Sequence, residues 1–542
     1  MNHNIAQTLY RTTAFNPEGK AVVVSRGGHY QQYTFEQVLH RTAAYAAALA
    51  DQRIEPADRV ILMVRPSLDF ICLTFALFQL GVPVILIDPG MGYKNLLRCI
   101  ASVRPTVFIG IPKAQIFRKI FSAPFQTVRK SICVGRSLGI LGKSLDSVTD
   151  YSIREFPVVS AAEDDLAAVI FTTGSTGPPK GVRYDHGVFQ AQLEIIRDYY
   201  GIRPHDIDLP AFPLFALFTI AMGATAVIPD MDPAHPSRVN PGRFARTIND
   251  NKVTYSFGSP AIWNVVSRYC LRHDITLPNL TKVLMAGAPV PGELIERVKR
   301  IMPEHGEIHT PYGATESLPA TSITGSEILS ETWEMTRQGK GTCVGRPLPG
   351  NDVRVIEASE KPFAKWDQVT ECETGNVGEI VIQGPVVTRG YDNNPEENRM
   401  SKIADRHGFW HRIGDVGYFD DQGRLWFCGR KAHRVITRRK ILYTIPCEAI
   451  FNEHPAVYRS ALVGVDMGAQ DDMLPVLVVE PNREISDVFG FIAELKKLGK
   501  QHAHTANINI FLLHPDFPVD IRHNAKIFRE KLAVWARDRL YG

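Results

Sequence analysis

The chain has 542 residues, which is too long for one ordinary hydrophobic core, so two or more domains are expected. Hydrophobic residues make up 44% and charged residues 22%, as is typical of globular proteins, and the net charge of +4 is too small to predict nucleic-acid binding. The eight cysteines are scattered without a Cys-x-x-Cys pair, so neither a zinc site nor a disulfide framework is indicated. With no secretory pattern near Met1, these features predict a cytoplasmic protein.

Strand-like apolar runs alternate with helical patterns through the first two thirds of the chain. The run 59–64 precedes an apolar helix in the stretch 70–87, and this stretch ends in a second strand. This alternation predicts α/β architecture with largely parallel sheets. The stretches 70–87 and 209–228 are interrupted by glycine and proline, so we interpret both as buried core, and the second alternatively as an acyl-binding wall. No transmembrane segment is predicted, and peripheral membrane association stays open.

After about residue 350 the pattern changes to short strands separated by turns, which predicts a more antiparallel, barrel-like part. A domain boundary is expected beside Arg430, dividing the chain into residues 1–430 and 431–542. The strand and helix patterns of residues 431–542 predict a small α+β domain. Its basic stretch, 430–440, is interpreted as a solvated face with one or two functional members.

The segment 171–181 follows an apolar strand and is rich in glycine and hydroxyl side chains. Glycines allow backbone N–H groups to approach an anion, and hydroxyls and a lysine add donors and charge, so the segment predicts a polyphosphate site. It is not a Walker A loop, because Lys180 precedes Gly181 instead of following a glycine and preceding Ser or Thr. The alternative is a polar turn between two strands. The phosphate-binding candidates are Thr172, Thr173, Gly174, Ser175, Thr176, Gly177 and Lys180.

Three further motifs carry suitable chemistry. In the segment 310–316, Tyr312 beside Gly313 is a candidate for stacking on a base, Thr315 for binding a phosphate and Glu316 for holding Mg²⁺. Asp415 is a candidate acceptor for ribose hydroxyls, and Arg430 follows it in a Gly-Arg pair. Small residues after a strand form a candidate adenine wall: Ala286, Gly287, Ala288 and Pro289.

These motifs, in this order, resemble the adenylate-forming superfamily of acyl-CoA synthetases, luciferases and peptide-synthetase adenylation domains. The resemblance implies a large N-terminal domain and a small mobile C-terminal domain, with ATP and Mg²⁺ as cofactors. It implies that a substrate carboxylate attacks the ATP α-phosphate, giving an acyl adenylate and pyrophosphate. Lys526 aligns with the adenylation lysine of that superfamily, and Thr315 and Glu316 with its catalytic Thr-Glu pair.

Two departures concern the second half-reaction. The hinge position of the superfamily, usually Asp or Lys, is Ala432, and the stretch 436–441 lacks the glycine that normally accompanies thioester formation with CoA. A closer resemblance, to the β-lactone synthetases of bacterial olefin biosynthesis (the OleC family), rests on the segments 212–218, 228–233, 426–431 and 517–526. It implies a long-chain 2-alkyl-3-hydroxy fatty acid as substrate, whose own β-hydroxyl expels AMP, and it leaves open a complex with other olefin-pathway enzymes.

Phe212, Phe215 and Phe218 recur at helical spacing, which suits a hydrophobic core and an acyl pocket equally. The general base for the β-hydroxyl is not evident from the sequence; the candidates are His309, Asp230 and His523. Two other functions stay open. One is a long-chain acyl-CoA or acyl-carrier ligase, and the other is a non-catalytic subunit that binds acyl chains or nucleotides.

Overall fold

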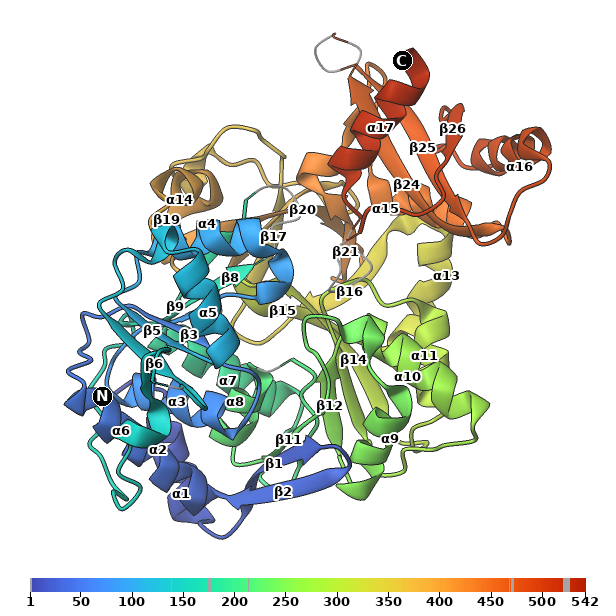
Figure 1. Ribbon diagram of the computed structural model, residues 1–542. Coiled ribbons are helices and arrows are strands. Elements are labelled where there is room, and N and C mark those ends of the chain that lie inside the picture. The colour runs from blue at the N-terminus through green and yellow to red at the C-terminus, as the bar shows by residue number, and fades with distance from the viewer. Residues whose placement is uncertain are drawn as a thin grey trace.

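The computed structural model describes residues 2–137, 139–172, 178–212, 214–466, 468, 472–519 and 527–542. Two large sheets are formed by residues before 431, and a small three-stranded sheet follows them in the chain. Figure 1 shows the small sheet and its helices at one corner of the larger body. The α/β fold with a large N-terminal and a small C-terminal domain is therefore confirmed.

The first sheet has seven strands, parallel except at one edge. The strand order is β7 (Lys143–Ser144), β6 (Lys130–Cys133), β5 (Val107–Gly110), β3 (Val60–Met63), β4 (Val84–Leu86), β8 (Leu166–Thr172) and β9 (Lys180–Asp185). The last two strands are antiparallel, with Thr172 opposite Lys180. The candidate phosphate loop is therefore the connection between two paired strands at the edge of this sheet.

Helices cover both faces of the first sheet, which explains its uninterrupted apolar strands. On β3, Val60 and Leu62 belong to one core cluster and Ile61 to another, because successive side chains of a strand point to opposite faces. Helices α2 and α3 share the first cluster, and α4 shares the second. The helices in this part of the chain are, in order, α1 (Gln7–Phe15), α2 (Phe35–Asp51), α3 (Leu68–Gln79), α4 (Tyr93–Val103), α5 (Pro112–Ile120) and α6 (Leu145–Val148).

The second sheet has an antiparallel half and a parallel half, and the outermost strand of the parallel half is again antiparallel to its neighbour. Its strand order is β17 (Asp352–Ile356), β18 (Gly378–Gln383), β20 (Gly408–Phe419), β21 (Leu425–Arg430), β16 (Thr342–Pro347), β15 (Ser317–Thr324), β14 (Glu307–Ala314), β13 (Lys282–Met285), β12 (Tyr255–Gly258), β10 (Ile207–Asp208), β11 (Thr225–Ile228), β1 (Lys20–Arg26) and β2 (His29–Thr34), and β19 (Lys402–Asp405) pairs with β20. The antiparallel pattern that the sequence predicts after residue 350 already begins at the β14–β15 hairpin. Thr315 and Glu316 are the two residues between those strands.

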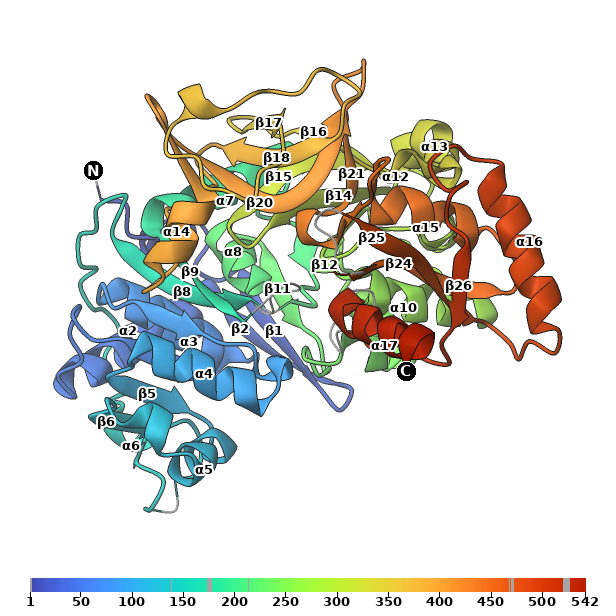
Figure 2. The ribbon, with the colours of Figure 1, turned by 90° about the horizontal axis from the view of Figure 1, so that it is seen from above.

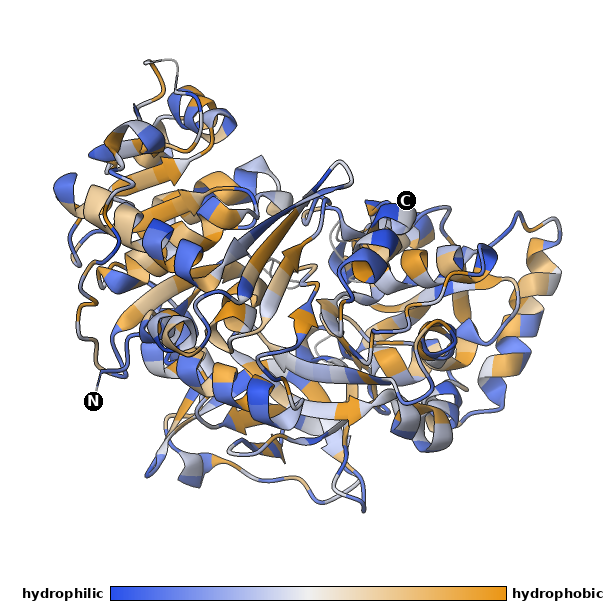
Figure 3. Ribbon diagram, turned by 90° about the horizontal axis from the view of Figure 1, so that it is seen from below, coloured by the Kyte–Doolittle hydropathy of each residue, from blue (hydrophilic) through white to orange (hydrophobic). Residues whose placement is uncertain are grey.

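A layer of helices separates the two large sheets. Helices α7 (His186–Tyr199) and α8 (Phe215–Ala221) share a core cluster with α2 and α3 and with residues of both sheets. Figure 3 shows the apolar residues concentrated on the inner strands and on the helix faces turned toward them. The opposite face of the second sheet is covered by α9 (Pro241–Asp250), α10 (Pro260–Arg272) and α11 (Gly292–Lys299).

The chain after residue 430 builds its own core. Strands β24 (Val457–Asp466), β25 (Met473–Pro481) and β26 (Ile510–Leu513) form one sheet, covered on one face by α15 (Thr444–Asn452) and α16 (Val488–Lys500) and on the other by α17 (Arg529–Tyr541). Both core clusters of this part consist of residues from Val435 onward. Figures 1 and 2 both show this C-terminal part beside β21 and near the helix α13 (Trp333–Met335).

Polar contacts join the two parts. Arg337 donates to Glu453 from Nε at 2.9 Å, and Arg434 donates to Glu360 at 2.7 Å. Within the described residues, no helix is both long enough and apolar enough to cross a bilayer. The apolar stretches 70–87 and 209–228 are instead divided between buried helices and strands, as predicted.

Candidate active site

A cavity of about 1080 Å³ lies where the two large sheets, the helix layer and the C-terminal part meet. Its wall contains polar and aromatic groups from β14, β20 and β21, apolar groups from α7 and α8, and Glu448 and Arg529 from the C-terminal part. Most of the residues singled out in the sequence are thus brought to one place, although they come from segments more than 200 residues apart.

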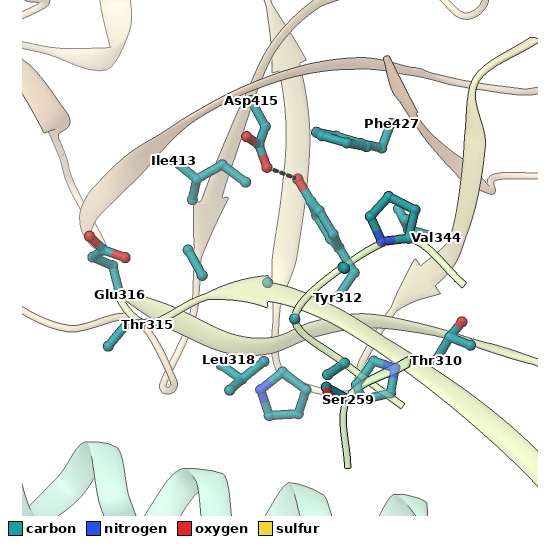
Figure 4. Close-up of a pocket in the computed structure, with 18 of the residues that line it drawn as sticks. Ser259, Thr310, Tyr312, Thr315, Glu316, Leu318, Val344, Ile413, Asp415 and Phe427 are labelled. Carbon is teal, nitrogen blue, oxygen red and sulfur yellow. Dashed lines mark hydrogen bonds between the residues drawn. The ribbon is translucent and has the colours of Figure 1, made fainter. Parts of the chain in front are cut away.

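The centre of the polar wall is a buried carboxylate with two donors. The Tyr312 hydroxyl donates to Asp415 Oδ2 at 2.8 Å, and Arg430 donates from NH1 to Asp415 Oδ1 at 2.7 Å. Figure 4 shows Tyr312 reaching from β14 to Asp415, with Phe427 beside its ring. Burial and the adjacent carboxylate raise the pKa of Tyr312 well above its usual value, so its hydroxyl remains a donor.

Thr315 and Glu316 form the turn between β14 and β15 and lie at the other side of this wall (Figure 4). The Thr315 carbonyl accepts a hydrogen bond from the Tyr184 hydroxyl, and Glu316 Oε1 accepts one from the Tyr391 hydroxyl at 2.7 Å. Gly313 has a φ of +157°, and a Cβ there would lie 2.3 Å from the Ser317 carbonyl oxygen. Only glycine fits this close approach of two backbone segments.

Lys180 begins β9 and lines the cavity. Its Nζ donates to Glu397 and lies 5.3 Å from the centre of the Tyr391 ring. Tyr391 therefore links Lys180 to Glu316, because its ring lies under the lysine and its hydroxyl donates to the glutamate. Of the other phosphate-loop candidates, the structure describes only the backbone of Thr172, and residues 173–177 lie outside the described residues.

Ala286, Gly287, Ala288 and Pro289 follow β13 and line the cavity, as a wall for a flat ring would. Gly287 has a φ of +95°, a backbone conformation that favours glycine. The four residues are small, so a planar group could approach the main chain closely here.

The apolar wall is aromatic. Phe215 and Phe218 lie on α8 and Phe212 precedes it, and all three line the cavity. Phe215 stacks on Phe257 with ring centres 3.6 Å apart, and Phe218 continues the aromatic surface to Phe189 on α7 at 6.0 Å. Phe215 and Phe218 also pack against the core cluster between the sheets, so both belong to the core as well as to the cavity wall.

The C-terminal part closes the cavity with a buried ion pair. Arg529 donates to both carboxylate oxygens of Glu448, at 2.6 and 2.7 Å. Ile527 also lines the cavity. Lys526 and His523 lie outside the described residues.

The other two candidates for a general base do not line the cavity. Asp230 is exposed and contacts Arg243 at 3.5 Å, and His309 is a half-buried neighbour of Tyr200, with ring centres 5.1 Å apart. Burial lowers the pKa of His309, so its ring is neutral near pH 7.

Sequence reasoning missed several groups around Glu316. The ammonium group of Lys402 is desolvated, which lowers its pKa to about 7, and Glu316 opposes that shift. His411 is buried, and burial together with the nearby charge of Lys402 lowers its pKa well below the usual value. Tyr391 contacts Glu316 directly. None of the three belongs to a recognisable motif, and only His411, four residues before Asp415, stood near one in the sequence.

The comparisons with known proteins agree with this geometry. The family described as AMP-binding enzyme matches residues 10–392, and the chain belongs to this family of adenylate-forming enzymes. Within it, the chain is 43% identical to an olefin beta-lactone synthetase from Stenotrophomonas maltophilia, over 93% of this chain and 91% of that protein. It is 42% identical to the olefin beta-lactone synthetase from Xanthomonas campestris, over 98% of this chain and 97% of that protein. The chain therefore belongs to the olefin beta-lactone synthetase family.

Among solved structures, the amide bond synthetase McbA from Marinactinospora thermotolerans has the same fold, with a TM-score of 0.79 and 21% identity. The match covers 98% of this chain and 99% of McbA. The predicted membership of the adenylate-forming superfamily is thus confirmed by sequence and by fold.

Proposed function

We propose that this protein uses ATP to adenylate a long-chain 2-alkyl-3-hydroxy fatty acid and then closes it to a β-lactone, with release of AMP and pyrophosphate. The observation that carries the proposal is the identity of 42–43% to two olefin beta-lactone synthetases over nearly their whole lengths. The cavity supports it, because one continuous space joins a nucleotide-sized polar wall to an aromatic wall suited to alkyl chains.

The polar wall supports a nucleotide in one orientation. Adenine would lie against residues 286–289, and Asp415, held by Tyr312 and Arg430, would accept the ribose hydroxyls. The phosphates would then extend toward Thr315, Lys180 and the glycine-rich loop. In this orientation the α-phosphate meets the carboxylate of an acid whose alkyl chains occupy the phenylalanine wall. Adenylation then depends on positioning and on stabilising negative charge in the transition state.

Glu316 is the residue that would hold Mg²⁺. Its Oε1 is occupied by the Tyr391 hydroxyl, and no cluster of three metal-ligating side chains occurs among the described residues. A single carboxylate such as that of Glu316 fits magnesium, which proteins commonly bind through one or two carboxylates together with substrate phosphates. When bound, the ion would neutralise charge on the phosphates.

We further propose that residues 431–542 act as a mobile lid that carries Lys526 to the reacting carboxylate and α-phosphate. The separate core of this part supports independent movement, and Ile527 in the cavity wall supports delivery at this position. If Lys526→Ala left ATP turnover unchanged, this role would be wrong.

The second step needs no external thiol, because the β-hydroxyl and the activated carbonyl belong to the same molecule and react at high effective concentration. The glycine-free stretch 436–441 forms a tight β22–β23 hairpin, β22 (Val435–Ile436) and β23 (Ile441–Leu442), in which the Thr437 hydroxyl donates to the Lys440 carbonyl at 2.7 Å. Arg438 in its turn pairs with Asp472 at 2.8 Å. This hairpin supports a reaction other than standard thioester formation.

The test uses purified protein with ATP, Mg²⁺ and a 2-alkyl-3-hydroxy acid, without CoA. The expected product is one water lighter than the acid, and its absence for every diastereomer would overturn the proposal. AMP release that requires CoA and accepts a plain fatty acid would instead identify an acyl-CoA ligase. We also propose a cytoplasmic site of action beside other olefin-pathway enzymes, which co-purification with a thiolase, a hydrolase or a reductase encoded nearby would support.

A further inference from the structure

His433 stands at the edge of the same cavity and has no role in the nucleotide site. It ends the short helix η7 (Lys431–His433), in the basic stretch that follows Arg430. Its Nε2 lies 3.0 Å from Glu530 Oε1 on α17, and its side chain is 6% exposed. Among the residues that the structure describes, it is the one histidine in the cavity wall.

The pair has the arrangement of an oriented base. A carboxylate that accepts a hydrogen bond from one imidazole nitrogen fixes the ring and its tautomer, and leaves the other nitrogen with a lone pair. Here Glu530 holds Nε2, and no hydrogen bond to Nδ1 occurs within the described parts of the chain. His433 is therefore placed to accept a proton at Nδ1 while Glu530 stabilises the resulting cation.

The charges around the ring favour the neutral form before the reaction. Burial lowers the pKa of His433, as do Arg529 on α17 and Arg430 on β21, and Glu530 opposes them. Glu448 on α15 is paired with Arg529, which lies between it and the His433 ring in this network of charges. At neutral pH the ring is thus unprotonated and able to act as a base.

We propose that His433, oriented by Glu530, is the general base of the lactone-forming step. The proposal rests on the proposed function. The β-hydroxyl of the acyl adenylate transfers its proton to Nδ1 as its oxygen bonds to the acyl carbon. The bond between that carbon and the phosphate oxygen then breaks, and AMP leaves with the electron pair. The imidazolium afterwards gives its proton to water, so no oxidant, reductant or thiol is consumed.

The experiment separates the two half-reactions in the full-length protein. For His433→Gln we expect ATP–pyrophosphate exchange within about twofold of wild type, while lactone formation falls about 10²-fold, the lower end of typical general-base contributions, and acyl adenylate accumulates. Glu530→Gln should lower the lactone rate less, because an amide still contacts Nε2. The matched control is His454→Gln, since His454 Nε2 lies 2.9 Å from Glu494 in the same C-terminal part but outside the cavity.

Two further readouts distinguish a base from a structural contact. In wild type the single-turnover lactone rate should fall as the pH drops through the pKa of His433, and in His433→Gln this dependence should disappear. Free imidazole should restore part of the rate in His433→Ala. Equal loss of exchange and lactone formation, or an unchanged lactone rate and pH profile in His433→Gln, would overturn the inference. A wild-type protein that makes acyl adenylate but no lactone would overturn the proposed function itself.

Discussion

Removal of one hydroxyl tests how the nucleotide is held. Tyr312→Phe keeps the ring, whose centre lies 5.9 Å from that of Phe427, and removes only the donor to Asp415 Oδ2. A hydrogen bond to a charged group contributes about 1.5–3 kcal/mol, and about 1.4 kcal/mol corresponds to a tenfold change in an equilibrium constant. Because Arg430 still holds Oδ1 at 2.7 Å, we expect the lower end of that range.

The assay is ATP–pyrophosphate exchange at varied ATP. The KM for ATP should rise about tenfold with kcat changed much less, since the lost interaction is present before and during the reaction. Tyr418→Phe is the control, because that hydroxyl donates to the Lys340 carbonyl at 2.9 Å and does not line the cavity. A KM for ATP within twofold of wild type in Tyr312→Phe, with a large increase in Asp415→Asn, would refute the argument that Tyr312 orients the carboxylate.

Three other changes probe the fold and the acyl wall. The pKa of Lys402 falls from 10.5 to about 7 on folding, so the unfolded state binds more protons than the folded state between these two pH values. The free energy of unfolding of the wild type, measured in urea, should therefore rise relative to that of Lys402→Met as the pH increases from 7 to 9.5. A stability difference that does not depend on pH would contradict this. Gly429→Ala should cost about 1–3 kcal/mol, because φ is +127° and the new Cβ would lie 2.4 Å from Thr444 Oγ1. Gly423→Ala, with φ of +70° and open space, should cost less in the same denaturation assay. Phe218→Ala should raise the KM for a long-chain acid about tenfold or more and leave the KM for ATP unchanged, which steady-state kinetics with both substrates would check.

Much of the site was evident from local chemistry. The order of the glycine-rich loop, the Tyr-Gly-Ala-Thr-Glu segment and the Gly-Asp and Gly-Arg pairs identified nucleotide chemistry, because phosphates and ribose require donors and carboxylates on tight backbone. The strand and helix near 59–87 were predictable from apolar runs, which both-face burial produces in a parallel sheet. The sequence pattern predicts antiparallel strands only after about residue 350, whereas they begin at the β14–β15 hairpin. The pattern of apolar residues along a strand cannot show that β15 returns antiparallel directly after Glu316.

The sequence by itself determined the family, the nucleotide motifs and the alternation of strands and helices, because each depends on residues close together in the chain. Tertiary structure alone decided which distant groups meet: Tyr391 and Lys402 around Glu316, Tyr312 on Asp415, and His433 on Glu530. These contacts depend on how strands are ordered in a sheet and on where the C-terminal part rests. No local pattern encodes them, since a lysine, a tyrosine or a histidine acquires its role only from the charges that folding places beside it.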